Sequence, residues 1–155
     1  MDRREECGSI GSESSSIEVY FKVFGEVVGK GRPRFTTRGG YARAVTPAKT
    51  RTYEERVRTE YIEECGVKWD RTVPLEMIVN AYFEVPKSAS KKAKERMILH
   101  ERPTKKPDWD NIGKAVSDAL NEIAYGDDAQ IVSATVNKFW ASESAIEVTI
   151  REVRT

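Results

Sequence analysis

Four segments of the chain alternate apolar and polar residues, and this pattern restricts the chain to folds built around a β-sheet. The segments cover residues 17–23, 75–83, 132–140 and 146–150. Stretches with helical spacing separate the first three, so the expected order is β-α-β-α-α-β-β. A short hairpin connection over residues 141–144 would join the last two strands. Hairpin and crossover connections in one chain imply a mixed sheet. We therefore predict an α/β fold of the mixed α+β kind, in which a four-stranded mixed sheet carries three helices.

Capping residues and apolar residues that recur every three or four positions predict the three helices. The first begins at Thr46-Pro47, where the threonine hydroxyl could cap the helix, and ends at Gly66. The second lies within residues 88–100 and starts after a serine. The third covers about residues 110–124 and carries a buried apolar face. These helices would pack on the predicted sheet.

The chain has 155 residues, enough for one domain that folds without a metal or disulfide bonds. Residues 1–15 are polar, so we expect a disordered tail followed by a single domain over residues 16–155. No apolar run approaches the roughly 18 residues of a membrane helix, and the start does not resemble a secretory signal. We therefore expect a cytoplasmic protein without membrane contact. One histidine and two cysteines disfavour a disulfide scaffold and a Cys/His zinc site.

A net charge of +1 hides a strong segregation of charge along the sequence. Residues 29–58, which begin with a predicted loop over residues 29–40, carry nine basic and two acidic residues, a net charge of +7. Residues 87–106 carry eight and two, a net charge of +6, whereas residues 108–128 carry one and six, a net charge of −5. Basic segments beside a carboxylate cluster are typical of proteins that hold a polyanion next to a metal ion. Ordinary solvated surfaces also show such runs of charge.

The acidic segment has an informative spacing. Asp108 and Asp110 lie two positions apart where the third helix begins, so both could reach one cation. Lys114 lies one helical turn after Asp110, and Asp128 follows the helix in the next turn. Oxygen ligands without Cys or His suit Mg²⁺, with Mn²⁺ as a possible substitute. A lysine beside such an ion could bind a phosphate.

Each of these features also has a purely structural explanation. Asp110, Lys114 and Asp118 could form an exposed stripe of ion pairs along the helix. Asp108 or Asp110 could serve only as a helix N-cap. The acidic pair that follows Gly126 could be an ordinary turn. The combination of all three with two flanking basic segments favours a site for chemistry.

The same residues resemble the RusA family of Holliday junction resolvases, which phages and prophages often carry. The family pattern D-x-D-N-x-x-K-x-x-x-D-A-L matches residues 108–120, and the D-D-x-Q segment that follows it matches residues 127–130. The sequence GKGRPR at residues 29–34 resembles a branch of the family with such a loop. The resemblance covers about residues 17–153.

The resemblance implies a homodimer of mixed α/β subunits that resolves four-way DNA junctions with Mg²⁺. By this match, Asp108, Asp110 and Asp128 are the metal-binding catalytic carboxylates, and Lys114 is the essential lysine. Asp127 matches the neighbouring acidic position and Asp118 the acidic residue within the helix, and we assign neither as a primary ligand.

We therefore predict an endodeoxyribonuclease that nicks four-way junctions symmetrically in recombination and repair. Five basic residues would bind backbone phosphates: Lys30, Arg32, Arg34, Lys105 and Lys106. Trp109 could stack on a base or pack against its own helix. The alternative function is a non-catalytic junction- or duplex-binding protein with a regulatory acidic site. A nuclease of the PD-(D/E)xK type is disfavoured, because no acidic-x-Lys tripeptide follows Asp108. A structural protein with a solvated acidic face is the last alternative.

Overall fold

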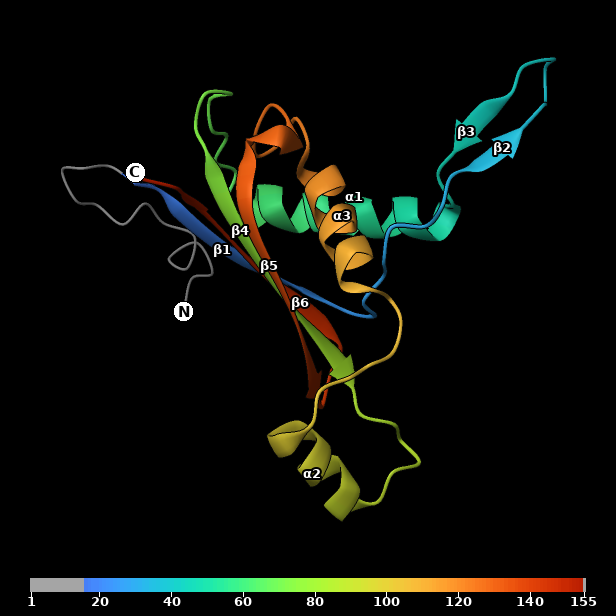
Figure 1. The fold of residues 1–155 in the computed structure, drawn as a ribbon, viewed down its shortest axis with the longest axis vertical. Coiled ribbons are helices and arrows are strands. Elements are labelled where there is room, and N and C mark those ends of the chain that lie inside the picture. The colour runs from blue at the N-terminus through green and yellow to red at the C-terminus, as the bar shows by residue number, and fades with distance from the viewer. Residues whose placement is uncertain (1–15, 155) are drawn as a thin grey trace.

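A computed structural model describes residues 16–154 and confirms the predicted α+β architecture (Figure 1). Within this range, one four-stranded sheet has the spatial order β1-β6-β4-β5. Its strands are β1 (Glu18–Phe24), β4 (Leu75–Glu84), β5 (Ile131–Ala141) and β6 (Ala145–Glu152). β6 is antiparallel to β1 and β4, whereas β4 and β5 are parallel, so the sheet is mixed. The tail predicted over residues 1–15 lies outside the described residues.

The helices are α1 (Ala48–Glu64), α2 (Lys91–His100) and α3 (Trp109–Leu120). α1 and α3 pack together on one face of the sheet, and their apolar residues join those of the strands in a single core (Figure 1). α2 is capped by Ser90 and buries no residue. It lies apart from α1 and α3 (Figure 1). No helix within residues 16–154 is long and apolar enough to cross a membrane.

Two helix boundaries differ from the sequence prediction. The hydroxyl cap predicted at Thr46 is wrong, because α1 starts at Ala48 and Pro47 takes the cap position without any side-chain cap. α3 ends at Leu120, four residues earlier than expected. The chain then turns through Glu122, whose φ of 66° lies in the left-handed region and cannot continue a right-handed helix.

Two predicted connections are also wrong. Residues 29–40 are not only a loop, because they contain strand β2 (Arg34–Thr36), which pairs antiparallel with β3 (Arg43–Val45) to form a hairpin. Residues 141–144 do not form a hairpin connection, because β4 lies between β5 and β6. β6 contains fully buried apolar residues and therefore occupies a central position, whereas β5 is partly exposed and lies at the sheet edge.

Candidate active site

The acidic motif lies where α3 begins. Asp108 occupies the N-cap position with extended backbone angles, φ −69° and ψ 154°, but its carboxylate does not cap the helix. That carboxylate pairs with the exposed ammonium of Lys106 at 2.9 Å. Asp110 lies in the first turn, where the helix dipole favours negative charge. The helix therefore does not use the Asp108 carboxylate for its own termination.

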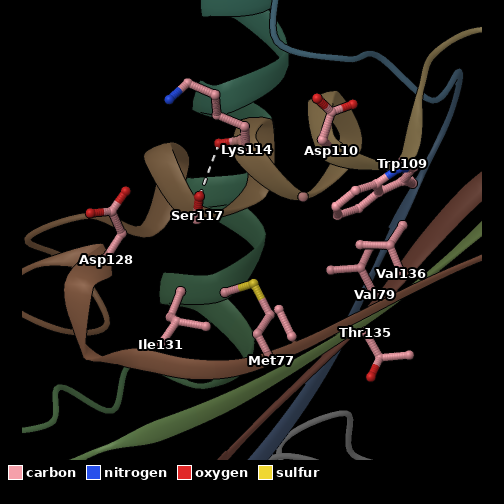
Figure 2. Close-up of a pocket in the computed structure, with 12 residues that line it drawn as sticks. Met77, Val79, Trp109, Asp110, Lys114, Ser117, Asp128, Ile131, Thr135 and Val136 are labelled. Atoms are coloured by element: carbon pink, nitrogen blue, oxygen red, sulfur yellow. Dashed lines mark hydrogen bonds between the residues drawn. The ribbon is translucent and has the colours of Figure 1, made fainter.

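A pocket of about 270 Å³ opens between α3 and the sheet. Asp110, Lys114 and Ser117 line it from α3, because residues three or four positions apart share a helix face. Asp128 lines it from the start of the short helix η2 (Asp128–Gln130), on the other side of Ser117 from Asp110 (Figure 2). Apolar side chains of β4 and β5 form the floor: Met77, Val79, Ile131 and Val136. Two of the predicted carboxylates and the predicted lysine thus line one pocket.

Gln130 fixes the turn that carries Asp127 and Asp128. Its side-chain oxygen accepts hydrogen bonds from the backbone amides of Gly126, at 2.8 Å, and Asp127, at 3.1 Å. Its side-chain nitrogen donates to two backbone carbonyls in the segment before β4. Asp127 completes a capping box around η2. Sequence reasoning assigned no role to Gln130, although a D-x-x-Q spacing is a capping-box signature.

The two neighbouring aspartates ionise differently. A hydrogen bond with Asp127, partial burial and the charges of Asp127 and Asp118 raise the pKa of Asp128, and Lys114 opposes them. The same hydrogen bond and the backbone amide of Ala129 lower the pKa of Asp127. Negative charge is therefore in excess around Asp128, which favours the approach of a cation.

The atoms that line the pocket include the kind of oxygen ligand that a hard divalent cation prefers. Asp110 and Asp128 offer carboxylate oxygens, and the described lining contains no His or Cys. The three predicted ligands are not gathered, since within residues 16–154 no three Asp, Glu, His or Cys side chains could hold one ion. Asp108 lies outside the lining and pairs with Lys106. The set of Asp108, Asp110 and Asp128 therefore stays a prediction, and it requires that a cation replace Lys106 as the partner of Asp108.

The segment Gly29-Lys30-Gly31 contacts both α3 and α1. The backbone amide of Lys30 donates to the Asn111 carbonyl at 2.9 Å. Its ammonium lies 2.6 Å from Glu54 of α1 and 3.0 Å from Asp118 of α3, and only 16% of the side chain is exposed. Partial burial lowers the pKa of Lys30, but the hydrogen bonds to these two carboxylates prevail and raise it above 10.5. The predicted contact of Lys30 with DNA stays a prediction, and its ammonium already pairs with two carboxylates.

The other predicted DNA-binding residues lie in two places. Lys105 and Lys106 are exposed in the segment between α2 and α3. This segment is attached to β5, because the Lys138 ammonium donates to the backbone carbonyls of Pro107, at 3.1 Å, and Lys105. Arg32 is exposed just before β2, where Arg34 is the first residue. Their contact with DNA stays a prediction.

A family model described as endodeoxyribonuclease RusA matches residues 25–151. The chain belongs to the RusA family. It is also 39% identical over 141 residues to the uncharacterized protein YqaN of Bacillus subtilis (strain 168), with 87% of this chain and 96% of YqaN covered. The family assignment makes the chain an endodeoxyribonuclease of a group that acts on junction DNA and generally depends on a divalent metal. The resemblance stated from the motif is therefore confirmed.

Proposed function

We propose that this protein is a Mg²⁺-dependent, cytoplasmic endonuclease that resolves four-way DNA junctions by symmetric nicking in recombination and repair. The observation that carries the proposal is the pocket shared by Asp110, Lys114 and Asp128. The chain belongs to the RusA family, and these three residues match the acidic motif and the lysine of that family. Mn²⁺ would substitute for Mg²⁺, because both ions prefer oxygen ligands.

Each residue of the pocket would have a separate task. Asp110 and Asp128 would hold the ion, and Asp108 would join them after it releases Lys106. The bound ion would supply positive charge that promotes ionisation of a water molecule and polarises the phosphate. Lys114 shares the pocket and would bind the scissile phosphate, because the carboxylates alone would repel a phosphodiester.

Trp109 lies beside these charged groups. Its side chain is 68% exposed and lines the pocket, so it is not part of the core. Figure 2 shows the ring next to Val79 and Val136 at the end of the pocket that holds Asp110. We propose that this ring contacts a base next to the scissile phosphate, because an exposed aromatic face can stack on any base.

Basic residues outside the pocket would bind the DNA arms. Lys105 and Lys106 precede the acidic motif, and Arg32 and Arg34 belong to the other basic segment. If these residues neutralise several phosphates, junction affinity must fall steeply as salt rises. A flat response between low and moderate salt would count against this assignment.

We propose a homodimer because two equal cuts require two equal active sites. A twofold axis in the protein supplies such sites directly and matches the pseudo-twofold symmetry of a four-way junction. Sedimentation of the full chain, alone and with junction DNA, should give two subunits per junction. One subunit per junction would leave the second cut without a site.

A non-catalytic protein that binds junctions or duplexes is the second candidate. One observation favours it: the three carboxylates are not gathered within the described residues, and Asp108 is paired with a lysine. In this case the acidic site would regulate DNA binding.

Cleavage of a labelled mobile four-way junction, beside linear duplex and flap DNA, separates the candidates. Reactions contain Mg²⁺, Mn²⁺ or EDTA. Asp110→Asn keeps the side-chain shape but removes a ligand charge, so we expect nicking to fall about 100-fold or more while junction binding persists. Glu143→Gln, which changes an exposed carboxylate between β5 and β6, is the matched control and should cut normally.

The outcomes point in different directions. Paired nicks that appear only on the junction and only with metal support the resolvase. Tight binding without nicking in either metal supports the binding protein. Equal cutting of all three DNAs keeps the metal-dependent nuclease and removes the structure selectivity.

A further inference from the structure

The β2–β3 hairpin, residues 34–45, stands clear of the rest of the molecule. Its two strands pair with each other, and Figure 1 shows the hairpin extending away from the sheet beyond the first turn of α1. Gly39 and Gly40, with φ of 85° and 83°, form the turn at its tip, in a left-handed conformation that glycine adopts without strain. A hairpin this short gains little stability from its own contacts. Its exposed side chains therefore contribute little to the stability of the fold and are accessible to a partner.

Two aromatic residues of the hairpin are left in water. Phe35 is 80% exposed and Tyr41 is 74% exposed, which are the two highest values among the exposed large apolar side chains of the described residues. Ala44 is the residue directly opposite Phe35 on β3, and its methyl group is too small to cover the ring. Large apolar side chains gathered on a projecting element indicate a surface that a partner covers.

The charge around these rings indicates the chemistry of that partner. Residues 27–53 contain no Asp or Glu, and Arg38 and Arg43 of the hairpin are exposed. A surface with uncompensated positive charge attracts a polyanion. Exposed aromatic rings among arginines are the arrangement with which proteins bind unpaired nucleic acid, where bases stack on the rings and phosphates bind the arginines. A regular duplex hides the faces of its bases, whereas a branch point can offer them.

We propose that Phe35 and Tyr41 stack on unstacked bases at the branch point of the DNA junction, while Arg38 and Arg43 hold the adjacent phosphates. This proposal rests on the proposed function, since it names how the same substrate is recognised. The hairpin would thereby recognise the branch independently of the carboxylates that cut.

The test uses the full chain with Asp110→Asn, so that binding is measured without cutting. Phe35→Ala and Tyr41→Ala are added singly, and Ile62→Ala serves as the matched control, because Ile62 is 54% exposed on α1. The DNA is a four-way junction with the fluorescent base 2-aminopurine at the branch point or, in a second molecule, within an arm. Phe35→Leu keeps an apolar side chain but removes the aromatic face.

We expect Phe35→Ala and Tyr41→Ala each to weaken junction binding about 10-fold or more and to leave duplex binding unchanged. The fluorescence change at the branch point should also be lost in these variants and in Phe35→Leu, and the change within the arm should be absent throughout. Junction binding and fluorescence equal to those of Ile62→Ala would overturn the proposal. Loss of dimerisation with normal binding per dimer would also overturn it, because the rings would then contact a second subunit.

The proposed function is tested separately in the same experiment. If the Asp110→Asn protein itself does not prefer junction to duplex, the proposed junction specificity fails, whatever the hairpin variants do. If it prefers the junction and only the hairpin variants behave like the control, the proposed function stands and the stacking role is wrong.

Discussion

Two adjacent parts of one basic motif have opposite surroundings. Residues 29–31 are packed between α1 and α3, and the ammonium of Lys30 contacts a carboxylate from each helix. The hairpin over residues 34–45 begins three positions later and exposes two aromatic side chains and two arginines, Arg38 and Arg43, to solvent. In the sequence both parts belong to one segment, residues 29–45, that is rich in glycine and arginine and contains no acidic residue.

We infer from this difference that basic residues of one motif are not equally available to bind DNA. Lys30 is neutralised by two carboxylates, so little of its charge remains to attract a phosphate. Arg38 and Arg43 of the hairpin are exposed in a stretch without acidic residues, so their charge remains available. Variants in residues 29–31 should therefore change stability and the geometry of α3, whereas variants in the hairpin should change DNA binding alone.

The largest effect on stability is expected for Gly29→Ala. A Cβ atom at this position would lie 2.6 Å from Cβ of Pro107 and 3.1 Å from Cβ of Asn111. A proline ring cannot rotate away, so the loop and the start of α3 must separate, which we expect to cost about 1–3 kcal/mol in the free energy of unfolding. Urea titration followed by circular dichroism measures the change.

Gly113→Ala is the matched control for this variant. Gly113 lies within α3, and a Cβ there would only contact Val136 at 3.4 Å. Because alanine favours a helix over glycine, this variant should be as stable as the wild type or more stable. If Gly29→Ala were equally harmless, residues 29–31 would not be tightly packed against α3.

The next largest effect is expected for Lys30→Met. The variant keeps most of the side-chain volume but leaves Glu54 and Asp118 without their shared cation. We expect the loss of these charged hydrogen bonds to lower the free energy of unfolding by about 2 kcal/mol. Most of this loss should persist in 0.5 M salt, because the ion pairs of Lys30 with Glu54 and Asp118 are largely shielded from solvent. Arg43→Met at an exposed position should cost less than about 0.5 kcal/mol. Equal values for the two variants would mean that Lys30 is as weakly held as the hairpin residues.

The pH dependence sharpens this contrast. The pKa of Lys30 in the folded protein lies above 10.5, because its carboxylate partners outweigh the effect of burial. The ammonium therefore stabilises the fold fully below pH 10.5, and this contribution is lost as the pH rises through the higher folded pKa. The stability difference between wild type and Lys30→Met should be constant from pH 7 to 9 and shrink above pH 10.5. A difference that vanishes already by pH 9 would contradict the assignment.

The periodicity of the sequence predicted those elements whose residues alternate between buried and exposed positions. The alternating segments became the four strands of the sheet, and Asp110 and Lys114 share a pocket because they lie one helical turn apart. The same spacing could have identified Ser117. The β2–β3 hairpin was missed because strands of three residues are too short to show an alternating pattern, although the Gly39-Gly40 pair between them is a turn signal.

The remaining features depend on contacts between distant parts of the chain. The position of β4 between β5 and β6 depends on the burial of the whole sheet. The residues at 141–144 therefore carry no sequence signal for it. Lys30 finds one partner 24 residues away on α1 and another on α3, which no spacing rule predicts. Likewise, the pairing of Asp108 with Lys106 depends on the conformation of the chain before α3.

The smallest effect on stability, and a selective effect on binding, is expected for Arg38→Ala and Arg43→Ala in the hairpin. Both side chains are exposed, so each variant should change the free energy of unfolding by less than about 0.5 kcal/mol. Each arginine that contacts a phosphate releases a counterion, so its removal should reduce the slope of log affinity against log salt by roughly 1. Fluorescence anisotropy of a labelled junction, measured from 50 to about 300 mM salt in the Asp110→Asn background, gives this slope. Lys30→Met should leave the slope unchanged, because its ammonium is already neutralised by Glu54 and Asp118. The opposite result, a reduced slope for Lys30→Met and unchanged slopes for the two arginine variants, would reverse the roles assigned to the two halves of the motif.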